Sequence, residues 1–374
     1  MLDPRITYLN HGSFGAVPRV VFDAHTSWRK RIEAEPVEML FRGAPPFHAA
    51  AKKSIGSALG MAGQDFGMVT NATEGVNAVL RSLKLKPGDE LLTTNHVYNA
   101  VRQAMKYVAA GSGATVREIE IPTPVHSSEQ IEQLIVDALS SSTRLLIIDH
   151  ITSPTALIFP VESIVRAAAA RGVDVMIDGA HAPGMVSLDV AFLGAAYYAG
   201  NLHKWACSPK GSAFLWVRPD RQADIHPLII SHFLGDGFLA EFAWQGTRDI
   251  AAWLTVPSAL EFLAGLGWDK VRTYNHELAV WTQRYLCERW GVDPLSPSTG
   301  ELLGSMCTVR LPAPLDKLSV EDGAKFQARL YYEEKIEVPV VIWAGAAHVR
   351  PCCQVYNAAE QYERLGDTIL RYAR

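Results

Sequence analysis

The chain has 374 residues, of which 48% are hydrophobic and 20% are charged, and its formal net charge is −4. This composition is ordinary for a globular enzyme long enough for two domains, and it lacks the basic excess that is typical of nucleic-acid-binding proteins. The first ten residues lack the basic start and apolar core of a signal peptide, and no apolar run is long enough to span a membrane.

The chain contains five cysteines, and no two of them form a CxxC pair. Because their number is odd and the chain is large, we do not expect a disulfide framework. No metal-binding residues are assigned. The expected location is the reducing cytoplasm. The cysteines are Cys207, Cys287, Cys307, Cys352 and Cys353.

The N-terminal part of the chain is expected to be an irregular lead-in followed by two helices. Residues 1–17 contain the glycine-punctuated turn Asn10–Gly15. Residues 18–35 then form a helix that starts at a proline, which suits the first turn of a helix. A second helix is expected to follow Pro45-Pro46 and to run to about Met61.

Residues 67–217 alternate between short apolar runs and helical segments. Apolar runs of strand length that alternate with helices indicate βαβ units, and hence a mostly parallel sheet that is covered on both faces. Strands are expected at residues 67–70, 90–94, 115–121, 144–150, 173–177, 195–199 and 211–217, and helices at residues 73–83, 100–110, 128–139 and 161–171.

After about Trp253 the pattern changes to that of an α+β unit. A long helical region over residues 252–290 is broken at Gly265–Gly267. Beyond it, strands are expected at residues 307–311, 337–342 and 348–352, and helices at residues 320–334 and 358–372. The expected fold class is therefore α/β, with a large domain over residues 18–252 and a smaller domain made of residues 1–17 and 253–374.

Lys204 follows the apolar run of residues 195–199, which ends at Gly200 and leads into a polar turn with His203. Burying an ammonium group without a partner is expensive, so a lysine just after a buried strand is unusual. One interpretation is a solvated lysine on a connecting loop. The other is a desolvated amine with a lowered pKa that can form a Schiff base with a carbonyl compound.

Asp178 ends the apolar strand expected at residues 173–177 and starts the sequence Asp-Gly-Ala-His. A carboxylate in this position is costly unless it meets a cation, and a protonated pyridine nitrogen is one such cation. The alternative is an aspartate that only caps the next segment. Asp178 precedes Lys204 by 26 residues with one intervening strand, so we expect the two at neighbouring strand ends of one sheet.

Two further strand ends carry side chains that suit a bound cofactor. Thr73 lies where a strand gives way to a helix, and helix N-termini bind phosphate groups, although plain helix capping is an alternative. His96 and Tyr98 follow the strand at residues 90–94, where a flat side chain could stack on a ring or only pack a loop. Together, these residues with Asp178 and Lys204 are the parts needed to hold pyridoxal phosphate.

The chain resembles a fold-type I pyridoxal-phosphate enzyme of the class V aminotransferase superfamily. Within it, the chain is most similar to the isopenicillin N epimerase-like branch, which neighbours the cysteine desulfurases and the ergothioneine-pathway C–S lyases. The resemblance covers nearly the whole chain. It is carried by Tyr8–Gly15, Asn71–Glu74, Asp178–His181, His203-Lys204, Trp244–Asp249, Val349–Pro351 and Tyr356-Asn357.

The resemblance implies a set of cofactor contacts. Lys204 would form the Schiff base, Asp178 would bind the pyridine nitrogen, and His181 would lie near the phenolic oxygen. Tyr98 is the first choice and His96 the second choice for stacking on the ring. The phosphate would be bound by Ala72, Thr73 and His203, and by Thr247 from a neighbouring subunit, which makes a homodimer part of the expectation.

The substrate contacts implied by the resemblance are fewer. Arg350 would hold the α-carboxylate of an amino-acid substrate with its planar fork. Ser153 stands where many relatives carry an asparagine that contacts the cofactor. Asn10 and His11 could line the substrate pocket, as could Phe14 and Arg248.

The reaction implied by the resemblance starts with removal of the α-proton by Lys204 as general base. Reprotonation on the opposite face, by Tyr98 or His96, gives epimerisation, which is the first expectation. Loss of a β-substituent would make the protein a C–S lyase on a cysteine derivative or sulfoxide, and reprotonation at the cofactor would make it an aminotransferase. A non-catalytic cofactor-binding protein is the alternative from another class.

A mechanism through a cysteine persulfide is disfavoured. Cysteine desulfurases use a mobile cysteine somewhat before the carboxylate-binding arginine, and residues 335–349 contain none. Cys352 and Cys353 follow Arg350 in an expected strand and are interpreted as core residues. A Rossmann-type nucleotide enzyme is also weakened, because no GxGxxG sequence follows the first strand.

Overall fold

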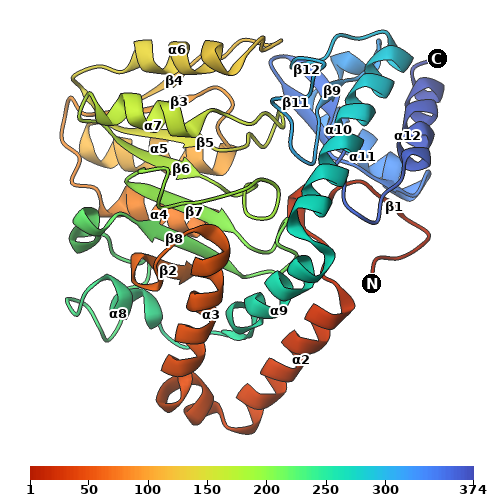
Figure 1. The fold of residues 1–374 in the computed structure, drawn as a ribbon. Helices are drawn as coiled ribbons and strands as arrows, with labels where there is room; N and C mark the ends of the chain where they lie inside the picture. Colours follow the sequence, from red (N-terminus) through yellow and green to blue (C-terminus); the bar gives the residue numbers. More distant parts are fainter.

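A seven-stranded sheet forms the centre of the large part of the protein in the computed structural model, which describes residues 1–374 (Figure 1). The strand order is β2 (Phe66–Val69), β8 (Ala213–Val217), β7 (Tyr197–Asn201), β6 (Asp174–Asp178), β5 (Thr143–Asp149), β3 (Glu90–Thr94) and β4 (Thr115–Ile119). The five strands from β7 to β4 in this order run parallel to one another, whereas β8 is antiparallel to both β7 and β2. The prediction of a mostly parallel sheet is confirmed.

Both faces of this sheet are buried. Successive residues of a strand point to opposite faces of the sheet, so each strand contributes to both. In β5, Leu146 and Ile148 join one apolar cluster, whereas Leu145 and Ile147 join another. Two buried faces explain why the strands read as continuous apolar runs. The first cluster includes residues of α3 (Ala44–Leu59), α6 (Ser128–Ala138), α7 (Val161–Ala169) and α9 (Ala251–Leu266), and the second includes residues of α4 (Ala72–Ser82) and α5 (Asn99–Ser112).

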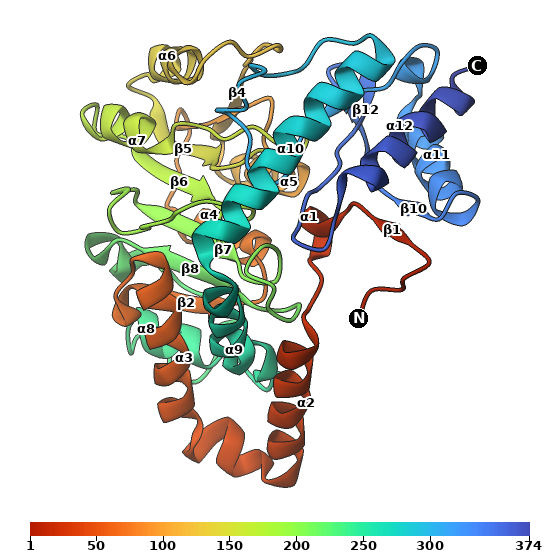
Figure 2. The same cartoon turned by 45° about the vertical axis from the view of Figure 1, so that its right-hand side comes forward.

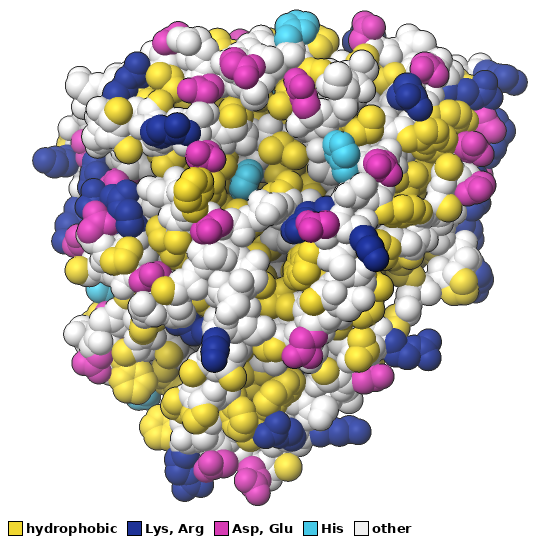
Figure 3. Space-filling model, viewed as in Figure 1, with side chains coloured by type: hydrophobic (Ala, Val, Ile, Leu, Met, Phe, Trp, Pro, Cys, Tyr) yellow, Lys and Arg dark blue, Asp and Glu magenta, His cyan; other side chains and the backbone are white.

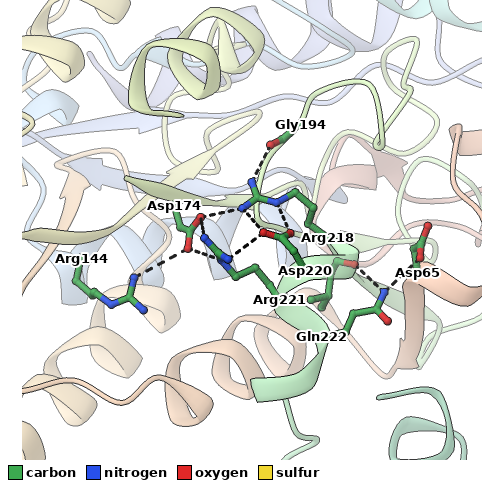
Figure 4. A network of polar contacts seen from close by, with 9 residues as sticks. Asp65, Arg144, Asp174, Gly194, Arg218, Asp220, Arg221 and Gln222 are labelled. Carbon is green, nitrogen blue, oxygen red and sulfur yellow. Dashed lines mark hydrogen bonds and ion pairs between the residues drawn. The ribbon is translucent and has the colours of Figure 1, made fainter. Parts of the chain in front are cut away.

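An ionic network lies at the amino end of strand β6 (Figure 4). Asp174, which starts this strand, is buried, and its carboxylate accepts hydrogen bonds from Arg221 Nε at 2.8 Å and from Arg218 Nη2 at 3.2 Å. Arg144 of the neighbouring strand lies 4.0 Å away. A buried carboxylate is stable only with such partners. The network therefore joins β5, β6 and the segment after β8 at the sheet edge opposite to the carboxyl ends.

The small α+β unit follows a break between two helices. Gly267, with φ of 87°, separates α9 from the long helix α10 (Trp268–Trp290), which confirms the predicted interruption. In Figure 2, α10 runs from beside the large sheet to the small unit. There it packs with α12 (Ala359–Tyr372) beside α11 (Val320–Tyr332) and an antiparallel sheet in the order β11 (Val340–Trp343), β12 (Ala346–Val349) and β9 (Val309–Arg310).

The N-terminal segment connects the two parts of the molecule. Strand β1 (Thr7–Tyr8) pairs in parallel with β10 (Ile336–Glu337) of the small unit, and the short helix α1 (His11–Phe14) follows it. Helix α2 (Arg19–Ala34) then packs against α9, as α3 does. Because the expected limit at residue 253 falls inside α9, we propose that the small domain starts with α10.

The structure contains several short elements that the sequence pattern did not predict. They include α8 (Phe238–Ala243) and a π-helical turn at Glu38–Arg42. The strand expected at residues 337–342 is divided into β10 and β11 around Pro339, which lacks the N–H that a continuous strand needs.

None of the helices combines the length and the apolar composition that crossing a bilayer requires. On the face that Figure 3 shows, acidic and basic side chains are interspersed among apolar and neutral ones. All five cysteines are buried and unpaired.

Candidate active site

A cavity of about 480 Å³ opens at the carboxyl ends of the central strands. Two larger cavities, of about 710 and 860 Å³, are lined by neither Lys204 nor Asp178. Of the residues predicted from the sequence, the 480 Å³ cavity is lined by Phe14, Ala72, Thr73, Tyr98, Ser153, Asp178, His181, His203 and Lys204.

The register of the sheet explains why Asp178 and Lys204 meet. Strands β6 and β7 are parallel neighbours, with Asp178 opposite Ala199. Strand β7 ends at Asn201, two residues later than expected, and the following turn returns Lys204 to the same edge. In parallel sheets, the residues that follow the carboxyl ends of strands form the ligand crevice.

The hydrogen bonds around Lys204 favour an uncharged amine. Lys204 Nζ lies 3.1 Å from Nε2 of His181, and the indole N–H of Trp205 donates to Nδ1 of the same imidazole at 3.3 Å. Because Nδ1 accepts a hydrogen bond, a neutral His181 carries its hydrogen on Nε2 and donates it to an unprotonated lysine. Burial and the nearby Arg350 cation act in the same direction and lower the pKa of Lys204 to about 8.

Asp178 is only 4% exposed, and its Oδ1 accepts a hydrogen bond from the backbone N–H of Ala180 at 3.0 Å. Burial raises the pKa of this carboxyl, and the charge of Lys204 opposes the shift. No salt bridge reaches Asp178, in contrast to Asp174 at the other end of the same strand. The carboxyl is therefore placed to gain from a cation in the cavity.

The N-terminus of α4 forms another wall of the cavity. The side chain of Asn71 caps the helix by accepting from the N–H of Glu74, so Thr73 is not the capping residue. The N–H of Ala72 donates to Oδ1 of Asn201 at 2.8 Å and is therefore already used. Thr73 lies in the first helical turn, where N–H groups lack an intrahelical acceptor, and it can donate to an anion.

Arg350 lies behind the cavity wall and contacts it through Ser153. Its Nη1 donates to both the carbonyl oxygen and, at 3.0 Å, the hydroxyl of Ser153, whereas its buried Nε has no partner. Arg350 is 5% exposed, and its charge lowers the pKa values of Lys204 and His181. The guanidinium is thus a buried cation close to the lysine.

The structure does not bring His96 to the cavity, which corrects its assignment as a possible stacking residue. Its Nδ1 lies 2.7 Å from Thr155 Oγ1, and its Nε2 lies 3.0 Å from the carbonyl oxygen of Ile121. The ring is fully buried and packs against Trp343. Tyr98, which is 45% exposed, lines the cavity in its place.

Asn10 and His11 also lie outside the residues that line the cavity, so their assignment as substrate-binding residues stays a prediction. Asn10 donates to the carboxylate of Glu337 at 2.7 Å. The ring nitrogens of His11 lie 2.8 Å from the Tyr356 hydroxyl and 3.1 Å from the carbonyl oxygen of Lys204. These residues support the backbone at Lys204 and connect it to the small unit.

The cavity residues that the sequence analysis did not assign to the site include Asp149, Asn201 and Lys210. Asp149 ends the apolar strand β5, just as Asp178 ends β6, so the same signal could have found it. Asn201 ends the buried strand β7 in the same way, whereas Lys210 carries no such signal, because its position depends on the turn after β7. Lys210 Nζ donates to the carbonyl oxygen of Gly15 at 2.9 Å.

None of the cysteines lines this cavity. Burial raises the pKa of the Cys207 thiol to about 12 and also raises the pKa of the Cys352 thiol. Cys352 is fully buried and accepts a hydrogen bond from the N–H of Gly12, which agrees with its interpretation as a core residue.

Comparisons with known proteins place these features in a family. A family model described as "Aminotransferase class-V" matches residues 42–329. Isopenicillin N epimerase of Amycolatopsis lactamdurans is 34% identical, with 98% of this chain and 95% of the relative covered. L-cysteine desulfhydrase of Arabidopsis thaliana is 33% identical, with 97% of this chain and 87% of the relative covered.

Solved structures show the same fold at lower sequence identity. A C-DES variant with glycine covalently linked to its PLP cofactor has a TM-score of 0.84 at 20% identity, covering 98% of this chain and 96% of that chain. The apo cysteine desulfurase of Thermococcus onnurineus NA1 has a TM-score of 0.81 at 18% identity, covering 98% and 94%. These likenesses confirm the expected fold type.

Proposed function

The chain belongs to the aminotransferase class-V family, whose cofactor is pyridoxal phosphate, and we propose that it removes the α-proton of an amino acid with Lys204 as the base. The observation that carries this proposal is the hydrogen-bonded amine of Lys204 in a cavity that also holds the buried carboxyl of Asp178. An amine with a pKa of about 8 is well matched to proton abstraction near neutral pH.

The residues present fit pyridoxal phosphate. Asp178 is a buried carboxyl without a salt bridge and would face the ring nitrogen. Thr73 and His203, which both line the cavity, would bind the phosphate, and Tyr98 would stack on the ring. Lys204 would hold the cofactor covalently. When bound, the cofactor spreads the negative charge that develops at the α-carbon of the substrate.

The protein's own groups then have separate tasks. Arg350 would hold the substrate carboxylate, while Ser153 keeps the guanidinium in place. His181, held by the indole N–H of Trp205, would keep Lys204 oriented and favour its uncharged form, which takes the proton. The charge of Arg350 assists this, because it disfavours protonation of Lys204.

Replacing Arg350 by lysine is expected to raise KM for the amino acid by about tenfold to a hundredfold, with a smaller effect on kcat. A single ammonium group cannot bind Ser153 and a carboxylate in the forked geometry of a guanidinium, and the lost charge-assisted bond accounts for about 1.5–3 kcal/mol. Steady-state kinetics measure the effect. Arg289→Lys, at a solvent-exposed ion pair, is the matched control. An unchanged KM for Arg350→Lys would show that the carboxylate binds elsewhere.

We propose epimerisation as the first candidate for the later step, supported by the 34% and 31% identical relatives named isopenicillin N epimerase. Since His96 lies outside the cavity, Tyr98 remains as the donor proposed for the face away from Lys204. A C–S lyase on a cysteine derivative is the second candidate, supported by the 33% identical cysteine desulfhydrases. For either reaction, a persulfide on this protein is not proposed, since no cysteine lines the cavity.

Incubation with candidate L-amino acids in D2O tests the proposed function. Deuterium at the α-carbon of both enantiomers would support the epimerase, whereas pyruvate and ammonia would support the lyase. Conversion of the bound cofactor to its amine form would support an aminotransferase. Absence of label and of every product, in a protein that shows the visible absorption of the bound cofactor, would support a non-catalytic cofactor-binding protein.

We also propose a homodimer in which Thr247 reaches the phosphate in the partner's site. Thr247 is exposed and lines no part of the cavity of its own chain. The segment before it carries exposed apolar side chains, which suit a protein–protein interface. These are Leu228, Ile229, Ile230, Leu234 and Leu239, each 39–58% exposed.

Mixing two inactive variants tests this arrangement. If the Lys204→Met and Thr247→Ala variants are unfolded together and refolded, half of the dimers are mixed, and each mixed dimer has one intact site. We therefore expect about a quarter of the wild-type activity to return, since the symmetry of the interface gives each site one residue from each chain. Each variant refolded alone is the control. If light scattering confirms the dimer but no activity returns, Lys204 and Thr247 of one chain serve the same site.

A further inference from the structure

The cavity contains a second buried acid, Asp149, to which the proposed function assigns no part. It ends β5 as Asp178 ends β6, and the two residues are direct partners in the parallel register of these strands. They are 2% and 4% exposed, and both line the cavity. Two carboxyl groups therefore lie next to each other at one edge of the sheet.

The alternation of the strands directs both side chains to the same face. Asp149 is in phase with Ile147 and Asp178 with Met176, and both of these apolar residues join the cluster that α4 and α5 cover. Oδ1 of Asp178 accepts from the N–H of Ala180, whereas Oδ2 of Asp149 is buried without any partner. At this depth, an unpartnered carboxyl oxygen costs less in the neutral, protonated acid than in the charged carboxylate.

The charged groups around Asp149 do not provide enough positive charge for two carboxylates. Asp178 faces it from β6, Lys204 from the turn after β7, and Arg102 from α5. Arg102 already binds Glu118 at 2.9 Å, so the single amine of Lys204, whose pKa is lowered to about 8, is left to face two carboxyl groups. Burial is the main reason that the pKa of the Asp149 carboxyl lies well above its ordinary value, and the charge of Asp178 is the second reason. Of two adjacent buried carboxyls that cannot both ionise, one keeps its proton.

We propose that Asp149 and Asp178 act as a carboxyl pair that retains one proton, with Asp149 as the protonated, positioning member and Asp178 as the carboxylate that faces the ring nitrogen. One negative charge on the carboxyl pair then matches one protonated ring nitrogen, so that these two charges cancel. The part that concerns the ring nitrogen rests on the proposed function, whereas the retained proton is a property of the protein alone.

Unfolding of the cofactor-free protein tests the retained proton. A carboxyl with a raised pKa in the folded state stabilises the protein at low pH, and this contribution is lost as the pH rises through the folded-state pKa. Asp149→Asn imitates the protonated acid and cannot ionise. The ratio of the wild-type unfolding constant to that of Asp149→Asn should therefore rise by up to about tenfold per pH unit between pH 5 and 8.

The control is Asp236→Asn at an exposed position, for which this ratio should stay constant with pH. The comparison cancels the contributions of histidines, which both proteins share. A ratio for Asp149→Asn that is also constant with pH would overturn the retained proton.

Binding of pyridoxal phosphate tests the division of roles. Asp149→Asn should keep the dissociation constant within about threefold of wild type, whereas Asp178→Asn should weaken binding by more than about thirtyfold, because it removes the charged partner. The reverse order would overturn the assignment of roles. If the wild type itself does not bind the cofactor, the proposed function fails, and the unfolding experiment still decides whether the proton is retained.

Discussion

Replacing Lys204 by methionine is expected to lower kcat by at least about a thousandfold, since the variant loses both the covalent link to the cofactor and the general base. The same substitution should make the cofactor-free protein more stable. Methionine has a similar length and no charge, so the apolar surroundings that disfavour the ammonium group accept it. Activity and stability should therefore change in opposite directions.

The stability gain should depend on pH in a defined way. The pKa of Lys204 falls from an ordinary 10.5 to about 8 on folding, so below pH 8 the folded wild type carries a cost that the variant does not. The shift corresponds to up to about 3 kcal/mol, and less because Nζ faces the solvent of the cavity. As the pH rises from 8 towards 10, the unfolded amine also loses its proton, and the difference should disappear.

Denaturant unfolding of the cofactor-free proteins at pH 6.5, 8 and 9.5 measures this difference. Lys84→Met is the matched control, because Lys84 is exposed and pairs with Asp224 on the surface. It should show no gain at low pH. A Lys204→Met protein that is less stable than wild type at pH 6.5 would contradict the claim that burying the charged amine of Lys204 destabilises the folded protein.

Gly15→Ala is expected to destabilise the protein by several kcal/mol and to abolish cofactor binding. Gly15 has φ of 70° and ψ of 155°, a conformation that is essentially restricted to glycine. An added Cβ would also overlap the carbonyl oxygen of His203 and lie 2.9 Å from that of Lys204. The backbone strain and the overlap each cost about 1–3 kcal/mol.

Gly235→Ala separates these two contributions. Gly235 has φ of 90°, but an added Cβ would meet nothing within 4 Å. This control should lose only the cost of the backbone conformation and keep its cofactor. Denaturant unfolding and the visible absorption of the bound cofactor report the two effects. If both variants lose the same free energy of unfolding and the same fraction of bound cofactor, the close approach of Gly15 to the Lys204 backbone is unimportant.

The sheet could be predicted because strands that are buried on both faces have continuous apolar sequences. The positions of Asp178 and Lys204 followed from this, since parallel neighbours place their carboxyl ends at one edge. The same reasoning would have found Asp149, which ends β5 in the same way. A polar residue that directly ends a buried strand is therefore a strong signal in this fold.

Residues farther from a strand end were not predictable in the same way. The side chain of Asn95 binds the N–H of Ile121 at 3.0 Å, and the adjacent His96 turns towards the carbonyl oxygen of Ile121 instead of the cavity. Tyr98 reaches the cavity because it stands at the start of α5. His11 and Asn10 contact residues more than 190 positions away, which local sequence patterns do not encode.

Strand β6 carries a buried aspartate at each end, and the two ends differ in the source of their counter-charge. At Asp174 the protein supplies permanent cations, so this carboxylate stays paired whichever ligand is bound. At Asp178 the compensating charge has to arrive with the ligand. The site should therefore rank pyridine compounds by the basicity of their ring nitrogen, which gives ligand screening by thermal shift a simple chemical scale.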